Sequence, residues 1–165
     1  MNFDSFLADI LATIIGGAIV AFLFFLVREK LFALQDLDGS WTYEQETKSS
    51  EYKPYIGMTV TFLVLLARDG NKVYGSAEKI RDKTNNGEAR EYIGQYRTRA
   101  EITGHIEKRY FSADRLSIHI VEAGEMRNSS TFHILDCGDS ARLSGRFSST
   151  VSNQTGIVTW IRRSS

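Results

Sequence analysis

The sequence has very little cysteine or proline: Cys137 and Pro54 are the only examples in 165 residues. A single cysteine excludes an internal disulfide and cannot by itself build a structural zinc site, so the chain suits a reducing compartment. An excess of one charge is also absent, because Lys plus Arg and Asp plus Glu number 20 each. Without a global field we expect no DNA or RNA polymer as a partner, and any site for an anion must be local.

Familiar catalytic motifs are missing as well. The chain has no phosphate-cradling glycine loop before a helix, no histidine pair at helical spacing with a glutamate, and no strand-turn-helix nucleophile. We therefore expect a protein that is not an enzyme and needs no cofactor. A barrel-fold enzyme would require a histidine and a carboxylate or nucleophile to converge inside one cavity.

What the sequence does contain is a long apolar run, Ile10 to Val27, without a charged residue. As a helix, a run of this length measures ~27 Å, which is enough to span a bilayer. A secretory signal peptide is the alternative, but the residues before the run include Asp4 and Asp9 and no Lys or Arg, and no small-residue cleavage site follows. The run predicts an uncleaved transmembrane anchor.

The residues that flank and line this run predict its orientation and its association. Arg28 and Lys30 follow it, which favours a single-pass protein with its N-terminus outside and the remaining chain in the cytoplasm. Small residues recur every four positions along it, in the ridges Ala8, Ala12 and Gly16, and Thr13, Gly17 and Ala21. Such ridges let helices approach closely in lipid, which favours a homo-oligomer. Gly and Ala are also common in any membrane helix, so the ridges are not specific evidence.

The rest of the chain predicts one all-β domain. Residues 1–36 form the transmembrane helix and a juxtamembrane turn, and residues 37–165 form the cytoplasmic domain. In this domain, β-branched and aromatic residues alternate with polar ones, separated by turn sequences such as Asp69-Gly70-Asn71. The expected strands are 39–46, 56–68, 72–80, 92–107, 115–122, 129–137, 141–151 and 156–163. The charged segment 81–91 is expected to be a surface loop or a mobile rim.

Eight sequential strands with short links most simply close into an antiparallel up-and-down barrel. Closure removes the exposed edges that would otherwise pair with other chains. A sandwich of two sheets is the alternative architecture.

Two aromatic residues and one cation near the ends of the domain resemble a known pattern. Gly39 and Trp41 form a Gly-x-Trp at the start of the first expected strand, and Trp160 and Arg162 share a face of the last. This resembles the lipocalin-like barrels, in which a basic residue of the final strand packs over the indole and closes the barrel.

With the membrane anchor added, the chain resembles the CD-NTase-associated transmembrane β-barrel effectors of bacterial CBASS anti-phage systems. The resemblance implies that the barrel binds a cyclic di- or trinucleotide, that the protein oligomerises in the inner membrane, and that the membrane is disrupted. Described members carry two membrane helices, whereas this sequence has one. Related defence systems use similar barrels that the nucleotide holds inactive, so both signs of regulation remain open.

A cyclic nucleotide requires aromatic faces for its bases and cations for its phosphates. Candidates for stacking are Tyr43, Tyr74, Tyr96 and Tyr110, and candidates for phosphate are Arg97, Arg99, Arg109 and Arg146. Tyr96, Arg97 and Arg99 stand out because the aromatic ring and the cations are close in sequence. The alternatives are core packing for the tyrosines and a solvated surface for the arginines, with Glu101 as a pairing partner.

Two further predictions concern the barrel interior. His105, His119 and His133 could bind a metal only if the barrel brought them together, and we expect no metal site. Alternation places His119 and His133 out of phase with their apolar neighbours, which predicts that they point outward or that the interior is polar.

A second hypothesis is a membrane-tethered carrier or scaffold for an apolar ligand or a partner protein. Its interior would be aliphatic and without arginine, and a pocket with Arg and Tyr together would count against it.

Overall fold

The computed structural model describes residues 3–27, 35–109, 112–123 and 128–163. The chain divides into two compact units, Met1–Ala33 and Leu34–Ser165. Tyr110, which the sequence suggested as a stacking residue, lies outside the described residues.

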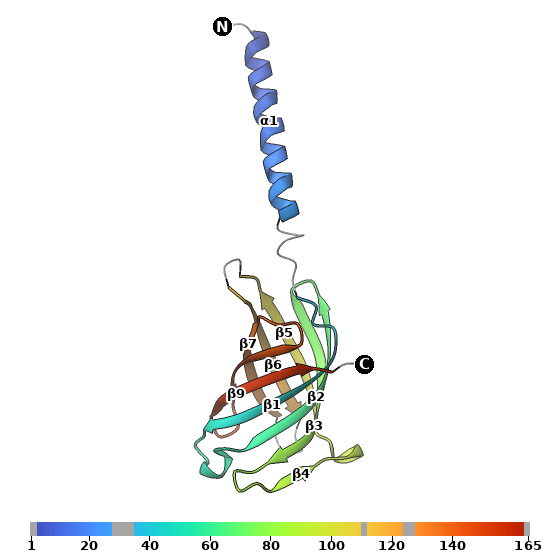
Figure 1. Cartoon of the computed structure of the whole chain (residues 1–165), viewed down its shortest axis with the longest axis vertical. Coiled ribbons are helices and arrows are strands. Elements are labelled where there is room, and N and C mark those ends of the chain that lie inside the picture. Colours follow the sequence, from blue (N-terminus) through green and yellow to red (C-terminus); the bar gives the residue numbers. More distant parts are fainter. Residues whose placement is uncertain (1–2, 28–34, 110–111, 124–127, 164–165) are drawn as a thin grey trace. The chain divides into compact units, whose positions relative to one another are not determined.

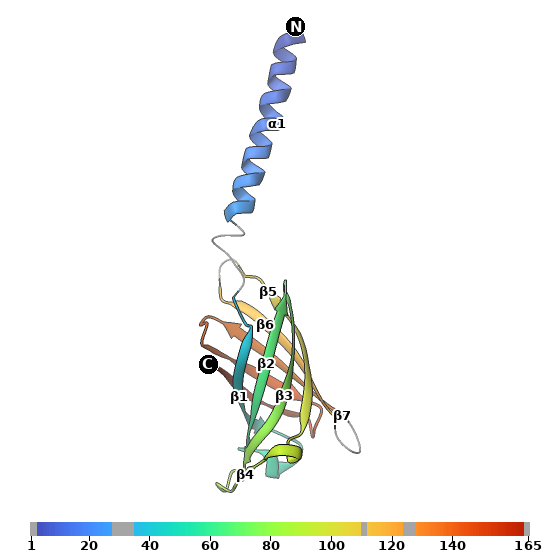
Figure 2. The same cartoon turned by 90° about the vertical axis from the view of Figure 1, so that its right-hand side faces the viewer.

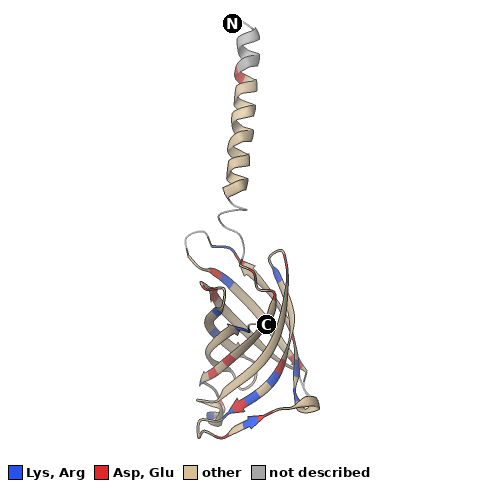
Figure 3. Cartoon of the chain, turned by 45° about the vertical axis from the view of Figure 1, so that its right-hand side comes forward, with Lys and Arg blue, Asp and Glu red and all other residues tan. Residues whose placement is uncertain are grey.

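The first unit contains helix α1, Phe3–Leu26 (Figure 1). Its segment Asp9–Leu26 is long and apolar enough to cross a membrane, with a mean hydropathy of 2.4 over 18 residues. The hydroxyl of Thr13 donates to the backbone oxygen of Asp9 at 2.8 Å, which satisfies the most polar side chain of the apolar run within the helix itself. From Asp9 to Val27 the chain carries no Lys or Arg (Figure 3).

The second unit is a closed antiparallel β-barrel of eight strands, so the predicted fold class is confirmed and the two-sheet sandwich is excluded (Figures 1 and 2). Each barrel strand pairs with the strands before and after it in the sequence, including β2 with β3. The last strand, β9, pairs with the first, β1, and this closes the ring. The barrel strands are β1 (Gly39–Ser49), β2 (Thr59–Asp69), β3 (Lys72–Lys83), β5 (Arg99–Glu107), β6 (Asp114–Ala123), β7 (Asn128–Cys137), β8 (Arg142–Ser149) and β9 (Gln154–Arg162). The short strand β4 (Ala89–Glu91) pairs with the end of β3 and, among the described strands, with no other.

The region between β3 and β5 differs from the sequence prediction. The expected loop 81–91 contains a hairpin, because β3 continues to Lys83 and pairs with β4. The expected strand start at Tyr92 was wrong: residues 92–98 are not a strand, and they include the short 3₁₀ helix η3 (Gly94–Tyr96). Gly94 has φ +58°, a left-handed conformation that interrupts an extended strand.

The barrel core is apolar and aromatic. The ring of Tyr43 lies between those of Phe62 and Trp160, with centroids 4.8 Å from each. These offset stacks add to the burial of three large side chains near the middle of the barrel. The other buried apolar residues are Leu37, Trp41, Val64, Leu66, Val73, Ala77, Ala100, Ile102, Ile106, Leu116, Ile118, Ile120, Leu135, Leu143, Phe147 and Val158.

Two inward-facing glycines allow neighbouring strands to approach closely. A Cβ at Gly145 would lie 1.9 Å from the backbone oxygen of Ile134, and one at Gly156 would lie 2.0 Å from that of Glu46. No side chain fits at these distances. Glycine at such positions is what allows a sheet to bend enough to close on itself.

One end of the barrel is closed by the contact that the sequence resemblance implied. The guanidinium of Arg162 lies over the ring of Trp41, with Cζ 5.5 Å from the centroid. The same guanidinium donates to the backbone oxygen of Asp38 and, at 3.2 Å, to Oδ2 of Asp36. The indole nitrogen of Trp41 donates to the backbone oxygen of Leu37 at 2.9 Å. Arg162 and Trp41 therefore join the chain segment before β1 to the last strand.

Candidate ligand-binding site at the barrel mouth

Two cations and a carboxylate surround one tyrosine at the end of the barrel near β4. We call these residues the mouth cluster: Lys79, Asp82, Arg90 and Tyr92. Lys79 Nζ lies 2.9 Å from Asp82 Oδ2, and the Tyr92 hydroxyl donates to the same oxygen at 2.6 Å. Lys79 Nζ lies 4.8 Å from the centroid of the Tyr92 ring, and Arg90 Cζ lies 5.6 Å from it. The cluster therefore combines an aromatic face with two cations and one carboxylate.

The β3–β4 hairpin positions this cluster. Its turn is held by Thr84 N–H donating to Glu88 O at 2.9 Å and Gly87 N–H donating to Thr84 O at 3.0 Å. Gly87 has φ +89°, which a side chain would resist. After β4, Tyr92 N–H donates to Ile80 O at 2.9 Å. The hairpin thus returns Tyr92 to the end of β3, beside Lys79 and Asp82.

The charges of this cluster persist at neutral pH. Burial opposes the charge on Lys79, but the hydrogen bond and charge of Asp82 outweigh it and raise the pKa of Lys79 above its ordinary value. For Asp82, burial is likewise outweighed by the hydrogen bonds from Tyr92 and Lys79, which lower its pKa. With Arg90 the cluster has a net charge of +1 and suits an anion.

A groove of about 400 Å³ adjoins the mouth cluster. One wall is the β3–β4 hairpin and the other is the segment before β2, which contains the 3₁₀ helix η2 (Lys53–Tyr55). The lining residues are Pro54, Tyr55, Met58, Asp82, Thr84, Glu88, Ala89, Arg90 and Tyr92. The groove therefore holds arginine and tyrosine together, which was the criterion set against an apolar-ligand carrier.

The barrel interior is polar in part, because His133 faces inward. It is 1% exposed and its Nε2 lies 3.3 Å from Gln45 Oε1. The expectation that His133 points outward was wrong, and the alternative of a polar interior holds for this strand. Consequently its neighbours Phe132 and Ile134 point outward, 46% and 53% exposed.

The three histidines are not brought together. His119 lies on the outer face, where its ring stacks on that of Phe132 with centroids 4.5 Å apart, and His105 is exposed on β5. Among the described residues, no group of three or more His, Cys, Asp or Glu could hold a metal ion.

The predicted ligand residues have different surroundings. The prediction that Tyr43 stacks a base was wrong. Its side chain is 1% exposed, and Phe62 and Trp160 cover both faces of its ring, so no base can stack on it. Tyr74 lies on the outer wall of β3, 44% exposed, and Arg146 is exposed on β8. Neither is near the mouth cluster in the strand register.

Tyr96, Arg97 and Arg99 lie on the rim of the mouth. Arg97 Nη1 and Arg99 Nε both reach the carboxylate of Glu78, at 3.1 Å and 3.2 Å, so their partner is Glu78 rather than Glu101. Arg97 Nε also donates to the backbone oxygen of Tyr92 at 3.1 Å, which links the rim to the mouth cluster. The Tyr96 ring is 73% exposed and is open to stacking. Arg109, the remaining phosphate candidate, has its Nε 4.0 Å from Glu107 Oε1.

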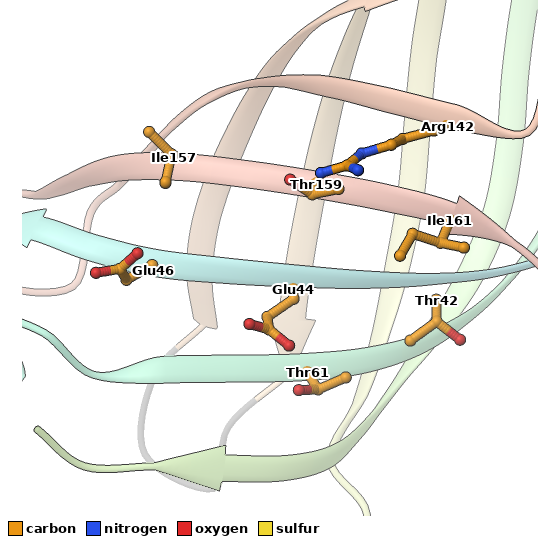
Figure 4. Close-up of a pocket in the computed structure, with 8 residues that line it drawn as sticks. All are labelled: Thr42, Glu44, Glu46, Thr61, Arg142, Ile157, Thr159 and Ile161. Carbon is orange, nitrogen blue, oxygen red and sulfur yellow. The ribbon is translucent and has the colours of Figure 1, made fainter. Parts of the chain in front are cut away.

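A second groove, of about 280 Å³, lies on the outer wall (Figure 4). Figure 4 shows Glu44 and Glu46 projecting from β1 and Arg142 reaching across β9 toward Thr159. The other lining residues are Thr42, Thr61, Ile157 and Ile161. Two carboxylates and one guanidinium line this groove as they line the mouth groove, but at the mouth Lys79 adds a second cation on the Tyr92 ring, so the mouth is the better candidate for an anion.

A third groove, of about 630 Å³, crosses β3, β5, β6 and β7 on the outer wall. Tyr74, Phe132 and Ile134 give it an apolar lining, with Lys72 and His105 at its sides. It is larger than the groove beside Glu44 and Arg142, and it suits an apolar ligand or a protein surface.

Comparison with known proteins supports the fold alone. No family model and no curated protein matches the chain. Among solved structures, EF1p2_mFAP2b bound to DFHBI is similar with a TM-score of 0.53 and 10% identity, over 77% of this chain and 94% of that chain. A redesigned β-barrel, b11L5F_LGL, is similar with a TM-score of 0.50 and 10% identity, over 78% of this chain and 92% of that chain. The fold is thus one that a ligand-binding barrel can have.

Proposed function

We propose that this protein is a membrane-anchored receptor whose barrel binds a cyclic oligonucleotide at the mouth cluster. The observation that carries the proposal is the placement of Lys79 and Arg90 on the ring of Tyr92, beside a groove. Phosphodiesters need cations, and bases need aromatic faces. Tyr96, Arg97 and Arg99 on the adjoining rim supply the same two groups.

The proposal extends to the consequence of binding, as the resemblance to CBASS effectors implies. The helix spans the bacterial inner membrane with the N-terminus outside and the barrel in the cytoplasm. A ligand that favours contact between barrels brings neighbouring helices together at a high effective concentration in the membrane plane. Ala12, Gly16, Gly17 and Ala21 then form the helix contact, and the assembly disrupts the membrane. The protein acts as a sensor and effector, without a catalytic step.

The groove on the outer wall of β3 to β7 favours a second candidate function, a tethered carrier or scaffold. Tyr74, Phe132 and Ile134 are exposed there, and they would bind an acyl chain or a partner surface. The barrel interior differs from the aliphatic lining which that hypothesis required, because Trp41, Tyr43, Trp160 and the buried His133 are part of it, and the core side chains fill it. An apolar ligand would therefore occupy the outer wall rather than the interior.

Thermal unfolding of the full-length protein in detergent distinguishes the two candidates. Both tryptophans, Trp41 and Trp160, lie in the barrel, so their fluorescence reports barrel unfolding alone. A cyclic di- or trinucleotide at ~100 times its dissociation constant should stabilise the barrel by ~2.7 kcal/mol. Stabilisation by fatty acid and not by any nucleotide would favour the carrier.

A pair of arginine variants locates the site. Arg90→Gln should weaken nucleotide binding, because it removes a cation from the Tyr92 ring. Arg142→Gln, on the outer wall, should leave binding unchanged and is the matched control. Equal binding by Arg90→Gln and the native protein would move the site away from the mouth.

A further inference from the structure

Glu122 carries a carboxylate that the fold directs into the barrel but does not pair. Along β6 the residues Leu116, Ile118 and Ile120 are buried in alternation, and Glu122 continues their phase, so its side chain enters the interior near the mouth. The inward residues opposite it in the register are small, Ala100 on β5 and Ala77 on β3. Ala77 and Ala100 are 1% and 5% exposed, so Glu122 is the charged end of a buried apolar row.

No described residue donates a hydrogen bond to this carboxylate or forms an ion pair with it. Burial raises the pKa of Glu122, and the charge of Lys79 only partly offsets this. Burial raises the pKa of Tyr43, and the negative charge of Glu122 is the second, smaller cause. The carboxylate thus lies between the aromatic core and the mouth cluster. An ionised carboxylate accepts hydrogen bonds and donates none, and leaving a partly buried one without donors costs free energy.

The group that best satisfies such a carboxylate presents two adjacent N–H donors in one plane. Guanine has this arrangement on its Watson–Crick edge, in N1–H and the N2 amino group. Adenine presents one donor beside an acceptor, which a carboxylate repels. Single-stranded nucleotides are read on these edges when their bases are free of a duplex.

We infer that Glu122 is a specificity residue that selects a guanine-containing cyclic nucleotide by accepting hydrogen bonds from N1–H and N2–H. This inference rests on the proposed function, since it names the base that the mouth admits. Lys79 and Arg90 hold the phosphates, and Glu122 reads the base at the barrel mouth. A bidentate contact of this kind discriminates between bases by ~10-fold or more.

The test uses full-length protein in detergent, with tryptophan fluorescence as the readout of thermal unfolding. Cyclic di-GMP, 3′,3′-cyclic GMP–AMP and cyclic di-AMP are titrated against the native protein, Glu122→Gln and Glu122→Asp. We expect the native protein to bind cyclic di-GMP at least ~10-fold more tightly than cyclic di-AMP. Glu122→Gln should lose this preference, because its amide offers one acceptor and one opposing donor, while Glu122→Asp should keep part of it.

Glu101→Gln is the matched control, since Glu101 is an exposed carboxylate on the outer face of β5; it should keep the native preference. Native binding without a guanine preference, or an unchanged preference in Glu122→Gln, overturns the role of Glu122 and leaves the receptor intact. Absence of binding by every nucleotide overturns the proposed function and this inference together. The native ranking decides the matter even if a Glu122 variant does not fold.

Discussion

Trp160 donates a hydrogen bond from its indole Nε1 to Nδ1 of His133, 3.2 Å away, inside the barrel. An indole nitrogen can only donate, so Nδ1 must be unprotonated and the proton of the neutral imidazole lies on Nε2, facing Gln45 Oε1. A protonated His133 would direct an N–H at the indole N–H. The contact therefore fixes both the tautomer and the neutral state of this buried ring.

From this we predict a loss of stability in acid that depends on His133. Burial lowers the pKa of His133 to about 3 in the folded barrel, whereas an unfolded histidine titrates near ~6.5. The unfolded state therefore takes up the proton first, so stability is complete above pH ~6.5 and falls as the pH drops toward about 3, by up to ~1.4 kcal/mol per pH unit. Denaturant unfolding of the native protein at pH 7 and pH 5 measures this loss.

His133→Gln removes the titrating group, so the difference between pH 7 and pH 5 should shrink, although the variant is less stable at pH 7. His119→Gln on the outer face is the control and should keep the native pH dependence. An identical acid loss in His133→Gln and the native protein would show that other groups cause it.

A second prediction concerns closure of the barrel by Arg162. Arg162→Ala removes the cation from the Trp41 ring and the hydrogen bonds to Asp36 and Asp38. We expect a destabilisation of ~1–2 kcal/mol, since each such contact contributes on the order of 1 kcal/mol or less at a partly exposed site. Arg163→Ala, at the next residue, should cost less than ~0.5 kcal/mol as an exposed surface change. Equal melting temperatures for the two variants would contradict a role in closure.

The third prediction tests the close approach of β7 and β8. Gly145→Ala places a Cβ against the backbone oxygen of Ile134, so the strands must separate or the pairing must shift. The cost should be ~1–3 kcal/mol or more, as for other overpacked sites. Ser144→Ala, an exposed neighbour on the same strand, should be nearly neutral. A Gly145→Ala barrel of native stability would show that this strand pair can relax without cost.

Cys137 supplies the fourth prediction. Burial, with the charges of Asp114 and Asp136, raises the pKa of Cys137 to about 12, so almost none of the reactive thiolate exists at pH 8. Alkylation by iodoacetamide at pH 8 should therefore be slow in the folded protein and fast in denaturant, as mass spectrometry can follow. Because Cys137 is the only cysteine, the reaction reports local opening at the end of β7. Equally fast labelling in both states would place the thiol in an ordinary solvated setting.

The barrel could be predicted from the sequence because its strands are sequential, its turns are short and its apolar residues alternate. The phase of β7 could not, since Phe132 and Ile134 are more apolar than His133 and yet face outward. The decisive partners of His133 are Trp160 and Gln45, which are distant in sequence, so no local pattern shows them. Tyr43 was misjudged for the same reason, because its stacking partners come from β2 and β9.

The mouth residues carried a signal that alternation could have revealed. Lys79 is in phase with the buried Val73 and Ala77, as Glu122 is with Ile118 and Ile120. A charged residue that continues an inward apolar phase at a strand end points into the barrel mouth. Arg90 and Tyr92 carried no such signal, because their position depends on the hairpin that β4 forms with β3.

The last prediction tests association of the helices. Among the described residues, nothing lies within 4 Å of a Cβ placed at Gly16 or Gly17, so a side chain that starts at either position enters open space. Gly17→Leu should nevertheless reduce association of full-length protein in lipid vesicles, because a small-residue ridge lets helix backbones approach and leucine holds them apart. Energy transfer between labelled copies measures it, with Ile15→Leu, on the opposite face of the helix from Gly17, as the control. Equal transfer in Gly17→Leu and Ile15→Leu would mean that the ridge is not a contact, and assembly would then have to depend on the barrel.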